Sequence, residues 1–126
     1  MEEIRRLPDS ELEIMKAVWQ HGAITRSDIQ ACIAHKAWKT ATFQALLARL
    51  EEKGFLSHEK QGNTFVYTAC ISREEYLPVE SRSALGRMFE GSPTRLVAAL
   101  HQTAALSDAD IDELYDYLRT LKGERV

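Results

Sequence analysis

Apolar residues recur at helical spacing in three stretches of the first half of the chain. A capping-box signature at Ser10–Glu13 opens the first stretch, and a weaker start signal at Thr25–Asp28 opens the second. Gly54 follows the third stretch and suits the first position beyond a helix. The pattern therefore predicts three helices, over about residues 10–20, 25–33 and 40–53.

The period of the pattern changes after Gly54. Two short segments, Phe55–Lys60 and Thr64–Ala69, are rich in aromatic and β-branched residues, and Gln61–Asn63 separates them. This arrangement is typical of a β-hairpin. Three helices followed by a hairpin is the order of elements in a winged helix-turn-helix domain.

The second half of the chain returns to helical spacing. A capping box at Ser72–Glu75 precedes Pro78. Because proline disfavours a helix interior, we expect a short turn and then a main helix from about Pro78 to Glu90. Ser92-Pro93 and Ser107–Asp110 are start signals for two further helices.

These elements predict a mainly α protein with a small β-hairpin. We expect an N-terminal winged helix-turn-helix domain over residues 1–71 and a C-terminal three-helix dimerisation domain over residues 72–126. The C-terminal helices carry more apolar side chains than so few residues can bury among themselves. They could pack on the N-terminal domain, but we favour a symmetric homodimer interface, formed in the last helix by Leu114, Leu118 and Leu121.

The predicted third helix combines a large apolar face with an unusually small opposite face. At about 100° per residue, the apolar face holds Phe43, Leu46, Leu47 and Leu50. The opposite face holds Ala41, Ala45 and Ala48, flanked by Thr42, Gln44 and Arg49. Helix propensity alone explains the alanines but not their flanks. A helix in the DNA major groove needs small residues for close approach and a few polar side chains that reach base edges.

This pattern points to contacts with DNA bases and phosphates. We expect base contacts from Thr42 and Gln44, with Ala41 and Ala45 allowing close approach. The net charge of −3 argues against a nucleic-acid partner, but residues 1–70 are neutral overall, with nine basic and nine acidic residues. A local positive excess surrounds the small face. It supplies the expected phosphate contacts, Lys39, Arg49, Lys53 and Lys60.

Other kinds of site find little support in the sequence. Cys32 and His35 have the spacing of one zinc-ligand pair, but a zinc site needs four converging ligands, so we expect no metal and no cofactor. Motifs of nucleophilic, metal-dependent or phosphate-binding enzymes are missing, and we do not expect an enzyme. The N-terminus has no apolar segment typical of a secretory signal, and no apolar run is long enough for a membrane span. We expect a cytoplasmic protein.

Several motifs resemble the penicillinase-repressor family of transcriptional regulators (BlaI/MecI/CopY). They are E-x-x-I-M-x-x-x-W at Glu11–Trp19, T-x-x-x-L-L-x-R-L at Thr42–Leu50, Lys53-Gly54, and G-x-x-F-x-Y at Gly62–Tyr67. The resemblance continues through Glu75-Tyr76 and residues 91–97 to the last predicted helix, so it covers nearly the whole chain. It implies a homodimeric winged-helix repressor that binds double-stranded DNA at a palindromic operator with TACA and TGTA halves. From the residues alone, a winged-helix protein-interaction module without a DNA target remains the alternative.

The resemblance also bears on how DNA would be released. Copper-responsive members end in a cysteine cluster, whereas this chain has no cysteine after Cys70. β-Lactam-responsive members are inactivated by cleavage of an Asn-Phe bond, and the matching pair here is Ala99-Leu100. We therefore expect operator binding without added metal and release by a route other than copper. Cleavage near Ala99-Leu100, with a membrane sensor protease as a further partner, stays open.

Overall fold

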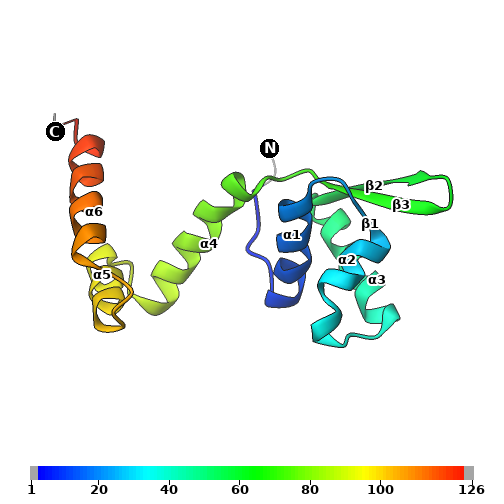
Figure 1. The fold of residues 1–126 in the computed structure, drawn as a ribbon, viewed down its shortest axis with the longest axis horizontal. Coiled ribbons are helices and arrows are strands. Elements are labelled where there is room, and N and C mark those ends of the chain that lie inside the picture. The colour runs from blue at the N-terminus through cyan, green and yellow to red at the C-terminus, as the bar shows by residue number, and fades with distance from the viewer. Residues whose placement is uncertain (1–2, 124–126) are drawn as a thin grey trace. The chain divides into compact units, whose positions relative to one another are not determined.

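A computed structural model describes residues 3–123, which fall into two compact units divided between Ser81 and Arg82. The first unit contains three helices, a short 3-10 helix, three strands and the beginning of a fourth helix (Figure 1). In chain order these elements are α1 (Asp9–His21), β1 (Ile24–Thr25), α2 (Arg26–Cys32), η1 (Ala34–Lys36), α3 (Thr40–Glu52), β2 (Leu56–Gln61), β3 (Thr64–Ala69) and α4 (Arg73–Met88). This is the winged helix-turn-helix order predicted from the sequence.

The predicted hairpin forms the wing and is joined by a strand that the sequence did not reveal. β2 pairs with β3 antiparallel from Leu56–Ala69 to Gln61–Thr64, so Gly62 and Asn63 form a two-residue connection. Gly62 has a φ of +61°, which a glycine adopts without strain. β1 adds to the outer side of β3 through only two residues, which is too short for a period-two pattern to show.

The core of the first unit gathers apolar side chains from α1, α2, α3 and the beginning of α4. α3 contributes the four side chains expected of it, Phe43, Leu46, Leu47 and Leu50. The helix ends as predicted, because Gly54 takes a φ of +83° and donates to the carbonyl of Glu51 at 3.0 Å. The Phe55 amide then donates to Leu50 at 2.9 Å. These bonds complete the helix end and direct the chain into the wing.

The first helix begins differently from the prediction. Ser10 and Glu13 were expected to form a capping box, but α1 begins at Asp9 after Pro8 and has no side-chain cap. The carbonyl of Pro8 accepts the first helical bond, from Leu12 at 2.9 Å. Burial of Leu7 fixes the chain just before the helix, so the capping-box prediction was wrong.

α4 also departs from the prediction, because it runs from Arg73 to Met88 with Pro78 inside it. The expected capping box is present: Ser72 and Glu75 exchange side-chain-to-backbone bonds of 3.0 and 3.1 Å, which lower the pKa of Glu75. A proline inside a helix costs about 3 kcal/mol or more. The cap and the burial of Tyr76, both before the proline, hold the first turns in place and offset this cost.

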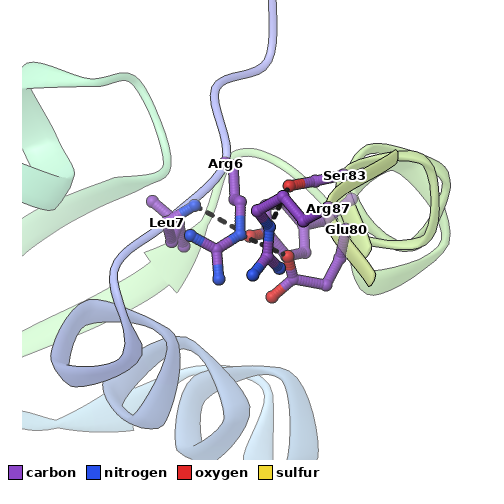
Figure 2. A network of polar contacts seen from close by, with 6 residues as sticks. Arg6, Leu7, Glu80, Ser83 and Arg87 are labelled. Carbon is purple, nitrogen blue, oxygen red and sulfur yellow. Dashed lines mark hydrogen bonds and ion pairs between the residues drawn. The ribbon is translucent and has the colours of Figure 1, made fainter. Parts of the chain in front are cut away.

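Tyr76 ties α4 into the core of the first unit. Its hydroxyl accepts a hydrogen bond from the Leu7 amide at 2.8 Å, and its ring lies 5.6 Å from Trp19 and 5.7 Å from Phe55. Nearby, Arg6 pairs with Glu80 at 3.0 Å (Figure 2). The domain boundary at 71/72 stays a prediction, but the first turns of α4 belong to the first unit by their packing.

The second unit consists of the rest of α4 with α5 (Pro93–Gln102) and α6 (Asp108–Leu121). The predicted caps are confirmed: Ser92 accepts from the Arg95 amide at 3.2 Å, and Ser107 and Asp110 form a capping box that lowers the pKa of Asp110. None of residues 82–123 is buried. The described helices include none long and apolar enough to cross a membrane.

The hydrogen bond between Tyr76 and Leu7 generates a stability prediction. Tyr76→Phe keeps the ring but leaves the buried Leu7 amide without its acceptor, which should cost about 1–3 kcal/mol in unfolding free energy. Burial also raises the pKa of Tyr76, so the unfolded state loses this proton first as the pH rises. The wild type should therefore lose stability above about pH 10, and Tyr76→Phe should lose less.

Urea unfolding of both full-length proteins at pH 8 and above pH 10 measures these effects. Because the two proteins differ only at residue 76, the contributions of all other groups cancel in the comparison. Equal stability of the two proteins at pH 8 would contradict the role assigned to the hydroxyl.

Candidate nucleic-acid interface

The small face of α3 lies open to solvent along two turns of helix. Ala41, Thr42, Gln44, Ala45 and Ala48 are all exposed, while the apolar face is buried in the core. The helix is therefore anchored on one side and free to approach a flat or grooved partner on the other. Thr42 and Gln44, which were predicted to contact bases, share this exposed surface with Ala41 and Ala45, which were predicted to allow close approach.

Three of the four predicted phosphate contacts are also exposed. Lys39 immediately precedes α3, Arg49 lies in its last turn, and Lys60 lies next to the end of β2. None of the three forms an ion pair with another residue of the described part of the chain. Their charges are thus available to a partner at both ends of α3 and on the wing.

Lys53, the fourth predicted phosphate contact, has a different environment. Its Nζ lies 2.6 Å from Oε1 of Glu11, and Glu11 is 2% exposed. Glu11 lies in α1 and Lys53 caps the end of α3, so the pair joins these two helices. A buried carboxylate needs such a counter-charge, because an uncompensated charge is strongly destabilising.

A cluster that the sequence reading missed connects the wing to α2 and α3. Arg26 donates from Nη2 to the Tyr67 hydroxyl at 2.9 Å, and its guanidinium lies 4.4 Å from the centre of the Phe65 ring. His58 lies 5.1 Å from the Tyr67 ring and 5.6 Å from the Phe65 ring, and its Nδ1 pairs with Glu51 of α3. We call these five residues the wing clamp. Their contacts join distant parts of the sequence, so no local motif marks them.

The remaining predicted residues lie on the second unit. Leu118 and Leu121 are exposed by 49% and 63%, and Leu114 is half-buried. Ala99 and Leu100 lie inside α5. This is the pair that corresponds to the Asn-Phe bond cleaved in the β-lactam-responsive members.

The cysteines and histidines do not assemble a metal centre among residues 3–123. The Sγ atom of Cys32 lies 3.6 Å from Nε2 of His21, which is not the His35 partner that the sequence spacing suggested. No group of three or more potential ligands occurs in this described part of the chain.

Comparison with known proteins connects this surface to a family. A family model described as penicillinase repressor matches residues 7–120. The penicillinase repressor of Bacillus licheniformis is 36% identical over 126 residues, covering 99% of this chain and 98% of the relative. The methicillin resistance regulatory protein MecI of Staphylococcus aureus (strain N315) is 25% identical over 113 residues, covering 89% of this chain and 92% of the relative.

A solved structure shows the same fold in the first unit. The solution structure of the Bacillus licheniformis BlaI monomeric form in complex with the blaP half-operator matches with a TM-score of 0.52 and 37% identity. The match covers 61% of this chain and 95% of that chain. Together, the match across nearly all of the sequence and the shared winged-helix fold show that the chain belongs to the penicillinase-repressor family.

Proposed function

We propose that this repressor binds a palindromic operator as a homodimer, with α3 of each protomer in the major groove and the β2–β3 wing beside it. The observation that carries the proposal is the exposed small face of α3, which is backed by a buried apolar face and adjoined by the exposed cations Lys39 and Arg49. The relative solved with its half-operator supports DNA as the partner. Operator halves of the TACA and TGTA type fit the resemblance to the family.

The roles along α3 follow from side-chain chemistry. Gln44 can form a bidentate pair with adenine, and Thr42 can contact a thymine methyl group. Ala41 and Ala45 leave room for the helix backbone to approach the bases. We assign phosphate contacts to Lys39, Arg49 and Lys60, on either side of these residues.

Lys53 does not join this group in our assignment. Its ammonium group already neutralises the buried carboxylate of Glu11, and moving it to a phosphate would leave that carboxylate unpaired. We propose that Lys53 acts on the stability of the fold instead.

Dimerisation through the second unit is supported by its exposure. Large apolar side chains remain uncovered on α6: Ile111, Tyr115, Tyr117, Leu118 and Leu121. A second copy of the same surface would cover them and place two recognition helices on two half-sites, as a palindrome requires. We propose that Leu114, Leu118 and Leu121 lie in this interface.

Release from the operator is proposed to follow a route other than copper binding. Cleavage near Ala99-Leu100 would separate α6 from the rest of the chain and so weaken the dimer. Because this pair is inside a helix, a protease, such as a membrane sensor, would first require α5 to open.

Salt titration of binding to duplex DNA tests the proposed function directly. The logarithm of the affinity should fall by about 0.9 per logarithmic unit of salt for each phosphate neutralised. A slope near zero on the operator would refute a DNA-binding role for this surface.

The assignment of Gln44 predicts a loss of sequence discrimination. Gln44→Ala should weaken binding to the operator by about 1–3 kcal/mol and relax the preference at one base pair, with little effect on scrambled DNA. Gel shifts on both DNAs measure the difference. Equal weakening on the two DNAs would show that Gln44 does not read a base.

Two lysine variants serve as controls for this measurement. Lys39→Ala should weaken binding to both DNAs alike and lower the salt slope by about 0.9. Lys53→Met should leave the slope unchanged but lower the unfolding free energy by about 3–5 kcal/mol, because Glu11 loses its counter-charge.

The dimer proposal predicts the effect of a charge in the apolar surface of α6. Leu118→Asp should give a monomer in sedimentation, and operator affinity should fall by about 10²–10⁴-fold as the two linked contacts are lost. Asp116→Asn, on the opposite side of α6, should remain a dimer. A fragment of residues 1–81, which retains Tyr76, should fold and bind as weakly as the monomer. A dimeric Leu118→Asp protein would place the interface elsewhere.

The release proposal predicts operator binding in the presence of a chelator. Gel shifts with chelator, Cu(I) or Zn(II) should show the same affinity. Micromolar Cu(I) that abolishes binding through Cys32 and Cys70 would contradict this expectation.

Intact-mass measurements on cells challenged with a β-lactam test the cleavage route, and a full-length protein during derepression would exclude it.

A further inference from the structure

The wing has few fixed points outside its own two strands. β1 supports β3 only at Val66 and Tyr67, so no other strand of the described residues flanks the part of the hairpin nearer the turn. A free two-stranded hairpin is marginally stable in water. The contacts of the wing clamp therefore decide how well the wing keeps its direction relative to α3.

Arg26 has the central position in the wing clamp. It is the first residue of α2, yet its side chain reaches β3 and contacts both aromatic rings of the clamp. Its Nε atom is buried and has no hydrogen-bond partner among residues 3–123. An arginine that served only as a solvated phosphate contact would not bury this atom, because long cationic side chains normally keep the charged group in water.

The geometry is specific to arginine. A planar guanidinium can stack on a ring and donate a directed hydrogen bond at the same time, whereas the ammonium group of lysine cannot stack. The stacked ring belongs to Phe65, which pairs directly with Lys60 across the hairpin. Arg26 thus fixes Phe65 of β3, which lies directly opposite Lys60, the residue assigned to phosphate binding.

His58 provides a second link on the same face of the hairpin. The pleat places His58, Lys60, Phe65 and Tyr67 on one face, while Ser57 and Thr68 lie on the other. Glu51 of α3 pairs with His58, so this face is connected to the recognition helix as well as to α2.

We propose that Arg26 is a positioning residue for operator binding. It holds the wing at a fixed orientation to α3, so that Lys60 reaches its phosphate when Gln44 reaches its base. This inference rests on the proposed function for the role of Lys60, but the positioning itself is a property of the protein without DNA.

The first test measures the wing in the free, full-length protein. Amide order parameters at Gly62 and Asn63 should be near 0.85 in the wild type and fall toward about 0.6 or below in Arg26→Gln. Arg26→Lys should behave like Arg26→Gln, because it keeps the charge but loses the stack. Tyr67→Phe removes only the hydroxyl that accepts from Arg26 and should give a smaller change in the same direction.

Thr68→Val is the matched control for the hairpin. It breaks a side-chain hydrogen bond of 3.1 Å between Ser57 and Thr68, across the same two strands but on the other face. The order parameters should keep their wild-type values in this variant. Wild-type values in both Arg26 variants, or an equal loss in Thr68→Val, would overturn the proposal.

The second test asks whether Arg26 acts through Lys60 on DNA. In the wild type, Lys60→Ala should lower the salt slope by about 0.9, and in Arg26→Gln it should cause no further change. Additive effects would show that Arg26 contacts DNA independently and would overturn the proposed route. If Lys60→Ala leaves the wild-type slope unchanged, the phosphate assignment fails, and the order parameters still decide the positioning role.

Discussion

The core of the first unit depends on the buried hydrogen bond from the Leu7 amide to the Tyr76 hydroxyl. It connects the segment before α1 with the first turns of α4, residues that are far apart in the sequence. Trp19 and Phe55 pack against the same ring, and the Trp19 indole donates to the carbonyl of Ile71 at 2.9 Å. Because the Tyr76 ring holds both ends of the first unit together, the buried face of α3 stays packed in the core while its small face is exposed to a partner.

The cations around α3 show why charge alone does not identify a binding surface. Lys53 and Arg49 lie four residues apart, yet one neutralises a buried carboxylate and the other extends into solvent. Arg26 represents a third case, in which a cation packs on aromatic rings. A count of basic residues treats all three alike. Their surroundings separate a residue that stabilises the fold, one that is available to phosphate and one that orients the wing.

Features with a local cause could be predicted from the sequence. The period of α3 identified its buried face, and short-range signals identified the caps at Thr25, Ser72, Ser92 and Ser107. Features that depend on distant residues could not. The start of α1 follows from the burial of Leu7. The helical conformation of α4 around Pro78 follows from the anchoring of Tyr76. The wing clamp depends on the contact between Arg26 and Tyr67, which are 41 positions apart. The base and phosphate contacts depend on the shape and sequence of a partner outside the chain, so the pattern of residues in α3 indicates their chemistry but not their pairing.

Because none of the residues from 82 to 123 is buried, the second unit has a consequence for how the protein unfolds. A segment without a buried residue has no interior of its own, and its order depends on what covers it. If a second copy supplies that cover, the melting temperature rises with protein concentration, since association draws the equilibrium toward the paired state. At a low concentration of the protein in the cell, the second unit would then be the first part of the chain accessible to degradation. The amount of repressor would thus influence its own lifetime.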